Sequence, residues 1–392
     1  MVSSMEFMAQ EIASQADLFH SSADDIMDQC KAIMQKYNFA NKINRVYITG
    51  CGDSYFAGIA CRDIFAKHTK IHTEVFQALE FSRYICEDEV DENALVLAIS
   101  SSGSVARTAE CVVRAAEKGA LAVAVTSRSD SRLAKLAPEQ VIVNIPESVG
   151  FAPGTQSYFA SLIALICIAI ALGDQLGTIN EEKSAEMIKY IKEIGEAMKK
   201  TVETCDGLAK KYIKAYGEDD GPQKIKMFHV LGSGPNWGTA QFGTMKLLEA
   251  AGFDSVPQGI EEWAHSQYFT TRPGSHTLLV VPRGESRERA LEIMQAITVM
   301  DGKKIVIGEE GDDELERWAD IYFPVCGISN IKEEYSPLIY QIPIELIALH
   351  LMNIQEVPCF DFEAKPWRKI ENFRQIFGSK IVPLAEKNAT DK

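Results

Sequence analysis

Residues 45–54 read Arg-Val-Tyr-Ile-Thr-Gly-Cys-Gly-Asp-Ser, a short apolar run that ends in a glycine turn carrying a hydroxyl. The run predicts a buried strand, and the turn predicts the start of a helix. Three more apolar runs follow at 94–100, 120–126 and 141–145, with helical patterns such as 104–118 between them. Apolar strands that alternate with helices are typical of a parallel sheet covered on both faces.

A second block with the same order of elements begins near Lys224. Its first strand, at 227–231, leads into Gly232-Ser-Gly234 and then into a helix that runs through Glu249. Further strands are expected at 277–282, 304–308 and 321–325, and an apolar helix at 336–352. We therefore predict an α/β fold of two tandem domains, each a mainly parallel sheet flanked by helices in a flavodoxin-like or Rossmann-like three-layer sandwich.

The length of 392 residues is too great for one typical core and suits two domains. The expected division is a helical arm at 1–44, a first domain at 45–175, a helical connector at 176–222, a second domain at 223–355 and a tail at 356–392.

The formal net charge is −15, and the sequence has no run of Lys and Arg that would form a basic surface stripe. Such a surface repels nucleic acid, so no nucleic-acid partner is expected. An anionic substrate remains compatible with this charge, because backbone amides at a helix N-terminus supply positive potential without a basic side chain.

The nine cysteines are scattered and never spaced as CxxC, which argues against a disulfide framework and against a zinc site. Residues 1–15 carry Glu6 and Glu11 and lack the apolar core of a signal peptide. The apolar stretch 159–172 is shorter than a membrane span and predicts a buried helix. We expect a cytoplasmic protein that uses neither metal nor cofactor and has no membrane partner.

Two loops that follow predicted strands carry the first functional signal. Gly50-Cys-Gly-Asp-Ser54 offers a tight turn at Gly52 and the hydroxyl of Ser54, although any strand-to-helix turn favours these residue types. Ser100-Ser-Ser-Gly-Ser104 places hydroxyls and a glycine before a helix, which suits a phosphate. The alternative is a helix N-cap with additional serines, but a cap needs only one hydroxyl. The chain has neither GxGxxG nor a Walker A lysine in these loops.

Two further elements are weaker when taken alone. The stretch 150–158 heads the apolar helix and places Thr155 and Ser157 where they can line the same pocket, but it is also a sensible helix start. Glu249 and His265 lie in the second block. Isolated residues of these types are more often a solvated carboxylate and a hydrogen-bonded histidine.

Taken together, these motifs resemble the tandem sugar-isomerase (SIS) domain family, in particular the isomerase half of glucosamine-6-phosphate synthase and the fructosamine-6-phosphate deglycases. The resemblance covers about residues 45–355. The positions that match the family's motifs are Gly52 and Ser54 in the first turn, Ser100, Ser101, Ser102 and Gly103 in the phosphate loop, Thr155 before the apolar helix, and Glu249, Glu262 and His265 in the second domain.

This resemblance implies a ketose or ketoamine 6-phosphate as substrate, with its phosphate on the 100–104 loop and further hydrogen bonds from Ser54 and Thr155. It implies that Glu249 lifts a proton next to a carbonyl or imine, and that His265 opens the sugar ring or protonates a departing amine. In the family this histidine reaches the active site of the neighbouring subunit, which implies a homodimer or higher homo-oligomer with shared sites.

The chain departs from the family pattern at several positions. Val105 stands where the family often has Thr, and Gln156 stands where Lys is common, so a hydroxyl and a charge are lost. The closing lysine of the synthase has only Lys365 and Lys369 as nearby candidates. The sequence has no match to a glutaminase domain, so glutamine is not expected as a built-in nitrogen donor.

Three functions stay open at this point. The favoured one is an enzyme acting at C1 and C2 of a ketoamine or amino-sugar 6-phosphate, such as a fructosamine-6-phosphate deglycase or an aminosugar-phosphate isomerase or deaminase. The second is a non-catalytic sugar-phosphate-binding regulator. The third is a simple aldose–ketose phosphate isomerase.

Overall fold

The computed structural model describes residues 3–37, 43–146, 152–218, 220–354, 359–361 and 366–385. The chain forms two compact units, which we name by their sheets. The first-sheet unit comprises Leu18–Pro146, Ser157–Tyr190 and Lys365–Lys392, and the second-sheet unit comprises Met1–Asp17, Glu147–Gln156 and Ile191–Ala364. Two long helices, α1 (Ser4–Lys36) and α8 (Glu181–Tyr216), contribute one part to each unit.

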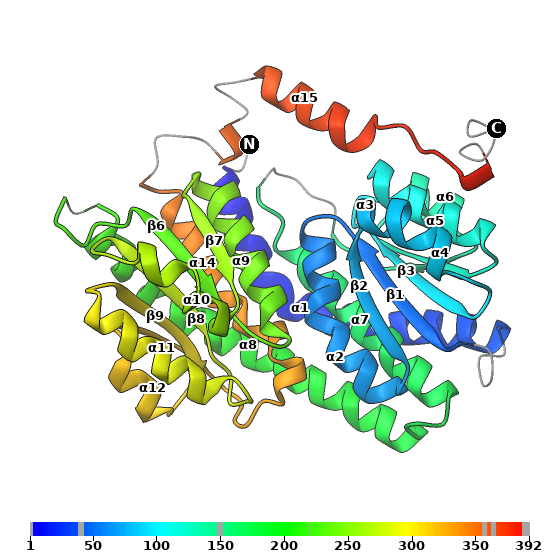
Figure 1. The fold of residues 1–392 in the computed structure, drawn as a ribbon. Helices are drawn as coiled ribbons and strands as arrows, with labels where there is room; N and C mark the ends of the chain where they lie inside the picture. The colour runs from blue at the N-terminus through cyan, green and yellow to red at the C-terminus, as the bar shows by residue number, and fades with distance from the viewer. Residues whose placement is uncertain are drawn as a thin grey trace. The chain divides into compact units, whose positions relative to one another are not determined.

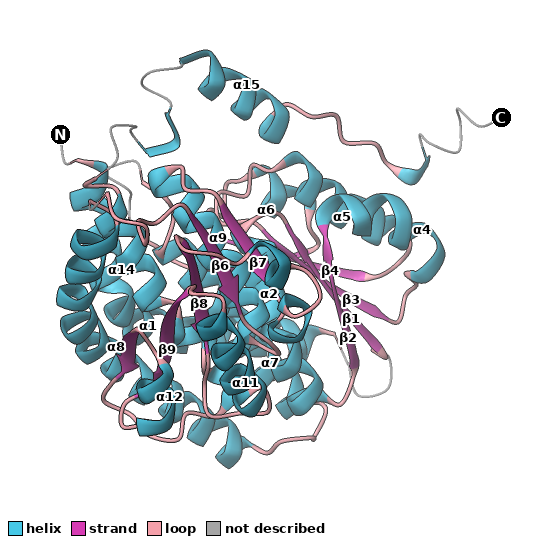
Figure 2. Ribbon diagram, turned by 60° about the vertical axis from the view of Figure 1, so that its left-hand side comes forward, coloured by secondary structure: helices cyan, strands magenta, loops and turns pink. Residues whose placement is uncertain are grey.

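The first sheet has five parallel strands in the order β2-β1-β3-β4-β5 (Figures 1 and 2). Their bounds are β1 Arg45–Gly50, β2 His72–Gln77, β3 Ala94–Ile99, β4 Leu121–Thr126 and β5 Glu139–Ile142. The predictions of β1, β3 and β4 are confirmed within one residue, while β5 begins two residues before the predicted run. The sequence pattern did not reveal β2, an edge strand that is mostly half-exposed and carries no continuous apolar run.

Helices cover both faces of this sheet. One face carries α3 (Ala78–Glu80), a π-helical turn (Phe81–Ile85), α4 (Cys86–Glu89), α5 (Ala106–Glu117) and α6 (Arg132–Leu136). On this face, Tyr47 and Val96 of the sheet pack in one cluster with Val112 of α5. The other face carries α2 (Asp53–Thr69), where a Cβ on Gly58 would lie 2.9 Å from side-chain atoms of Ile48 and Val75. A glycine at this position therefore lets α2 approach the sheet closely.

The apolar helix α7 (Gln156–Gln175) is long and apolar enough to cross a membrane by composition alone. Its most apolar window is 94% buried within the protein. The contacts include the Cys61 thiol of α2 against the Leu162 carbonyl and the Cys167 thiol against the Ala23 carbonyl of α1. The prediction of a buried core helix is therefore confirmed.

The second sheet also has five parallel strands, in the order β10-β9-β8-β6-β7. Their bounds are β6 Met227–Leu231, β7 Ser255–Gln258, β8 Ser275–Val280, β9 Lys303–Glu309 and β10 Ile321–Val325. Read from β7, this order is the order of the first sheet, so the repeat of strands and helices in the sequence corresponds to a repeat in the fold. The predicted pair of tandem α/β domains is confirmed.

Helices also lie on both faces of the second sheet. The cluster of Leu231, Leu279 and Trp263 places α10 (Ile260–Trp263) on one face, together with α11 (Arg287–Val299) and α12 (Asp313–Trp318). The remaining elements of this unit are α9 (Asn236–Ala251), α13 (Pro337–Tyr340), α14 (Ile342–Leu351) and the 3₁₀ turns Gln267–Thr270, Glu333–Tyr335 and Cys359–Asp361. A Cβ on Gly243 of α9 would lie 2.7 Å from Ile344, so α9 and α14 are closely packed.

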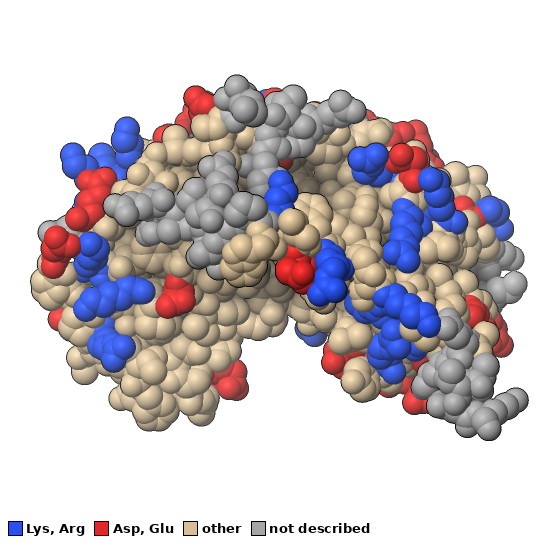
Figure 3. All heavy atoms as spheres, turned by 90° about the horizontal axis from the view of Figure 1, so that it is seen from above, with Lys and Arg blue, Asp and Glu red and all other residues tan. Residues whose placement is uncertain are grey.

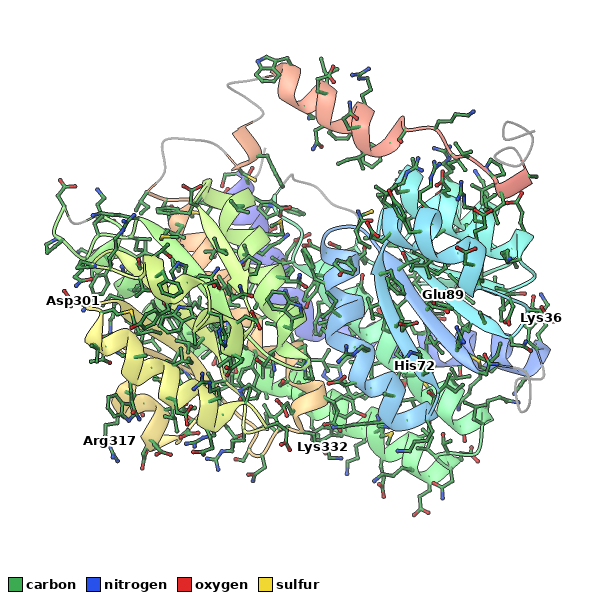
Figure 4. All side chains as sticks on the ribbon, in the orientation of Figure 1. Lys36, His72, Glu89, Asp301, Arg317 and Lys332 are labelled. Atoms are coloured by element: carbon green, nitrogen blue, oxygen red, sulfur yellow. The ribbon has the colours of Figure 1, made fainter. Side chains whose placement is uncertain are left out.

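Strand order fixes where a ligand can bind. In each sheet the order reverses direction next to the first strand, between β1 and β3 and between β6 and β8. Ligands of open parallel sheets bind at such a switch point, outside the carboxyl ends of the strands. His72, which begins β2, lies at the other end of the strands of the first sheet, away from this switch point (Figure 4).

Two buried histidines occupy neighbouring strands of the second sheet. His276 has its Nδ1 2.7 Å from the Tyr212 hydroxyl and its Nε2 2.9 Å from the Gln223 carbonyl. Neither ring nitrogen of His229 has a hydrogen-bond partner within the described ranges. Burial lowers the pKa of each histidine to about 4, so both rings are neutral in the folded protein at neutral pH.

These histidines predict a specific loss of stability in acid. Each pKa is lower in the folded than in the unfolded chain, so the stabilisation is complete above about pH 6.5 and is lost as the pH falls toward about 4. H229L removes one such group, so the free energy of unfolding should fall less steeply over this range than in wild type. Chemical denaturation at a series of pH values measures the slope.

The matched variant is H276L, which removes a histidine with two hydrogen-bond partners. It should cost about 1–3 kcal/mol at neutral pH, because it leaves the Tyr212 hydroxyl and the Gln223 carbonyl without their partner. H229L should cost less than about 1.5 kcal/mol there. Equal losses at neutral pH for the two variants would contradict the assignment of His229 as an unpaired ring.

Candidate functional site

The loops after β1 and β3 lie next to each other because their strands are paired up to their carboxyl ends, with Gly50 opposite Ile99. A Cβ on Gly50 would lie 2.9 Å from the Ser54 Cβ and 3.1 Å from the Ile99 carbonyl, so the turn into α2 is tight. Gly52 has φ +55° and is the N-cap residue of α2. Ser54 is partly exposed in the first turn of α2. The structure therefore brings the two predicted loops together at one switch point.

The loop 100–104 is braced from behind by the residues after β4. The Ser101 carbonyl accepts hydrogen bonds from the Ser127 amide and from the Thr126 hydroxyl, both at 3.0 Å. The Ser101 hydroxyl lies 3.2 Å from that of Ser127. Ser100 is buried, whereas Ser102 is exposed. The bracing therefore uses both the carbonyl and the hydroxyl of Ser101 and fixes the conformation of the loop.

Gly103 is required by this shape. Its φ is +60°, in the left-handed region, and a Cβ there would lie 2.1 Å from the Ser131 hydroxyl and 2.9 Å from that of Thr126. The Gly103 carbonyl also accepts from the Leu133 amide at 2.9 Å, which ties the loop to the start of α6. Only glycine satisfies both the backbone conformation and the close contact.

Helix α5 begins at Ala106, two residues later than predicted, and its N-cap residue is Val105. No side chain caps this helix, so the interpretation of the serines as a simple N-cap is wrong. The Ser104 hydroxyl instead donates to the Ser102 carbonyl at 3.2 Å. The first-turn amides of α5 and the serine hydroxyls together form the kind of helix terminus that binds anions.

The flank of α5 is bound to the chain near its C-terminus. The contacts are Arg107 to the Ser379 hydroxyl (3.0 Å), Glu110 to the Val382 amide (2.8 Å), Arg114 to the Val382 carbonyl (2.8 Å) and Glu117 to the Leu384 amide (2.7 Å). Glu110 has no exposed surface and also pairs with Arg83 at 2.5 Å. Seen from above, Lys and Arg side chains gather over this unit (Figure 3), although the net charge is −15.

Thr155 has partners other than those the resemblance implied. Its amide and hydroxyl both donate to one carboxylate oxygen of Glu11, at 3.1 and 3.0 Å. Thr155 is fully buried, so in this conformation neither donor is available to a phosphate. Gly150, which begins the predicted element, lies outside the described residues, whereas the Gly154 carbonyl accepts from Lys246 at 3.1 Å.

Glu249 lies near the end of α9 with 31% of its side chain exposed, so it is less desolvated than the proposed base was expected to be. Its Oε2 accepts from Lys246 Nζ at 2.6 Å. Lys246 has no exposed surface and also lies over the Phe242 ring. Sequence reasoning missed Lys246, although its place three residues before Glu249 puts both on one helix face.

His265 is exposed in the turn after α10, and its Nε2 lies 3.3 Å from Glu261 Oε1. Glu262, which matches the acidic position of the family motif, is exposed, and its carbonyl accepts from the His265 amide and the Ser266 hydroxyl. The carboxylate beside the imidazole is therefore that of Glu261, which Arg289 also binds at 2.6 Å. These two hydrogen bonds, the one from Arg289 first, lower the pKa of Glu261.

The candidate closing lysines give no support to a site. Lys365 lies outside the described residues. Lys369 is exposed on α15 (Pro366–Phe377), with its ammonium over the Phe373 ring. Among the described residues, no group of three or more His, Cys, Asp or Glu could hold a metal ion.

At the carboxyl ends of the strands of the second sheet, the loop after β8 is in contact with a carboxylate of the protein itself. After β8, the Glu285 amide donates to the Glu333 carboxylate at 3.2 Å. A Cβ on Gly284 would lie 2.3 Å from that carboxylate. A side-chain anion thus takes the place that a ligand anion would take, which leaves the 100–104 loop as the candidate phosphate site.

A pair of glycine substitutions tests this loop. G103A should reduce the affinity for inorganic phosphate and for a sugar 6-phosphate, because the methyl group would collide with Ser131 and displace the loop. G119A is the control: φ at Gly119 is +81°, but its nearest contact would be an ordinary 3.4 Å to Glu92. It should cost about 1 kcal/mol of stability and leave the affinity unchanged. Titration calorimetry measures both, and equal binding by the two variants would count against the loop.

Comparison with known proteins tests the resemblance inferred from the sequence. Residues 40–171 match the family model of the SIS domain. A glutamine–fructose-6-phosphate aminotransferase (isomerizing) of Clostridium tetani is 27% identical over 312 residues, which are 79% of this chain and 49% of that protein. This chain therefore spans about half the length of that relative.

Two solved structures share the fold. The C-terminal domain of glucosamine-fructose-6-phosphate aminotransferase from Francisella tularensis superposes with a TM-score of 0.77 and 20% identity, covering 89% of this chain and 96% of that one. For tagatose-6-phosphate ketose/aldose isomerase from Escherichia coli these values are 0.74, 15%, 91% and 94%. With two sheets of the same strand order, these findings confirm the resemblance: residues 40–171 match the SIS domain, and the chain shares the fold of the two solved structures.

Proposed function

We propose that this chain is a phosphosugar isomerase of the SIS family that moves protons at C1 and C2 of a sugar 6-phosphate. The observation that carries the proposal is the contact between Lys246 and Glu249, a fully buried ammonium held 2.6 Å from a partly exposed carboxylate. A partly exposed carboxylate can reach a substrate, and the buried cation beside it can stabilise negative charge on an adjacent oxygen. A protein that only binds sugar phosphates has no need of such a pair.

In this proposal the phosphate binds at the 100–104 loop, to the serine hydroxyls and the first-turn amides of α5, with Ser54 adding a hydrogen bond. Glu249 takes the proton from the carbon next to the carbonyl or imine, and Lys246 stabilises the oxygen that becomes negative. The role first assigned to Thr155 requires that Glu11 leave its amide and hydroxyl, so Thr155 is not included in the phosphate site.

The finer part of the proposal is the substrate: a ketoamine or amino-sugar 6-phosphate, with the chain acting as a fructosamine-6-phosphate deglycase or an aminosugar-phosphate isomerase or deaminase in the cytoplasm. His265 is mostly exposed and contacts Glu261 rather than Glu249. An exposed imidazole suits a residue that completes the active site of a second subunit. We therefore include a homodimer with shared sites in the proposal.

The direct test is turnover by the wild-type chain across fructosamine 6-phosphates, glucosamine 6-phosphate and unsubstituted ketose 6-phosphates. Turnover of the amino-substituted compounds supports the proposed substrate, and turnover of unsubstituted sugars alone indicates an aldose–ketose isomerase. E249Q should reduce kcat by about 10²–10⁴-fold while binding of the sugar phosphate persists. Unchanged turnover in E249Q would remove Glu249 from the mechanism, and binding without turnover in wild type would indicate a regulator.

The shared site gives a separate prediction. Homodimers of E249Q and of H265N should each be inactive, because every site lacks one of the two groups. Mixing the two by unfolding and refolding should restore about a quarter of wild-type activity, since half of the dimers are mixed and each mixed dimer has one intact site. Absence of any recovery, with mixed dimers demonstrated by mass spectrometry, would assign both residues to sites within one chain.

A further inference from the structure

The N-terminal part of α1 is built into the second-sheet unit by three polar side chains. Glu11 binds Thr155, the Ser14 hydroxyl accepts from Gln156 Nε2 at 3.1 Å, and the Gln15 amide donates to both oxygens of Glu345 at 3.0 and 2.9 Å. Gln15 has no exposed surface. This part of α1 is therefore not a peripheral arm, and its contacts converge on the turn that begins α7 and on α14.

Glu11 makes the contact that leads to the candidate active site. One of its oxygens accepts both the amide and the hydroxyl of Thr155, a residue 144 positions along the chain. The residue before it, Gly154, offers its carbonyl to Lys246 Nζ at 3.1 Å. A continuous path of hydrogen bonds and one peptide unit thus joins Glu11 to the Lys246–Glu249 pair, entirely within one unit.

The ammonium of Lys246 depends on this path. A buried ammonium is costly unless its hydrogens are bound, and moving one acceptor moves the charge with it. Two of the acceptors are the Glu249 carboxylate and the Gly154 carbonyl. The position of the Gly154 carbonyl depends on the turn that contains it. Proton transfer is sensitive to displacements of about 1 Å, so movement of this turn would affect the reaction.

We propose that Glu11 is a positioning residue: by holding the Thr155 turn, it fixes the Gly154 carbonyl and hence the Lys246 ammonium against Glu249. This inference rests on the proposed function of that pair. It goes beyond the family motifs identified in the sequence, none of which includes a residue of the N-terminal helix. Glu11 itself does not contact the substrate in this proposal.

The experiment compares variants of Glu11 with a control on the same helix. E11A should lower kcat by about 100-fold with KM changed less than about threefold, because the phosphate loop belongs to the other unit. E11Q keeps an oxygen that can accept both hydrogen bonds and should retain most of the activity. E11D keeps the charge but is one carbon shorter and should lose about 10-fold in kcat, which keeps the test decisive if E11A does not fold.

The control is E6A, which removes a carboxylate that accepts hydrogen bonds from the amide and hydroxyl of Ser3 at the start of α1, and it should leave kcat and KM unchanged. If Glu11 only stabilises the start of α7, E11A will unfold more easily but keep the kcat of its folded fraction, and this overturns the proposal. A rise in KM with constant kcat overturns it as well.

Failure of the proposed function is recognised separately. If wild type turns over no sugar phosphate, crystal structures of wild type and E11A still test the positioning. Displacement of the Lys246 ammonium from the Gly154 carbonyl in E11A supports the inference without any assay of activity. Retention of that contact at its wild-type distance of 3.1 Å overturns it.

Discussion

The arrangement of the candidate site depends on one buried charge. Lys246 has no exposed side-chain surface, and a protein can hold an ammonium in such a place only when acceptors surround it. One acceptor, the Glu249 carboxylate at 2.6 Å, is the group that we propose as the base. In this proposal the same contact supplies a partner for the buried ammonium and places a cation beside the base. The turn at Gly154, the head of α7 and the first turns of α1 follow from it, because each supports the next.

Carboxylates of the chain bind backbone amides at two places near the start of a helix, where a ligand anion could otherwise bind. Glu11 takes the Thr155 amide at the head of α7, and Glu333 takes the Glu285 amide at the switch point of the second sheet. No side chain caps α5 or α11, the helices that follow β3 and β8, but the Glu333 carboxylate binds an amide two residues before α11. The two sheets repeat one strand order, yet a carboxylate of the chain binds the loop after β8, whereas we propose that the loop after β3 binds the substrate phosphate.

The sequence predicted the inner strands well, because a strand buried on both faces must be a continuous apolar run. The edge strands β2 and β7 escaped, since each is half-exposed and β7 contains Pro257, which an edge strand tolerates. The loop at 100–104 and Glu249 were found from local pattern and resemblance. Glu11 could not be found that way, because nothing in the sequence near it indicates a contact with Thr155. Likewise, the resemblance selected Glu262 as a motif position but did not indicate that the carboxylate beside the His265 ring is that of Glu261.

Helix α5 is held in place by side chains on its flank, which leaves the amides of its first turn available to the phosphate that we propose as ligand. The helix carries Arg107, Glu110, Arg114 and Glu117 on one flank. These side chains bind the Ser379 hydroxyl and the backbone of Val382 and Leu384 through charged hydrogen bonds. Charge-assisted bonds to a buried carboxylate such as Glu110 are strong and resist rotation of the helix. The first-turn amides point along the helix axis. Contacts that hold the flank of α5 therefore also hold the direction in which these amides point. The tail of the chain, which the sequence pattern left irregular, is therefore part of the support of the loop that the sequence identified first.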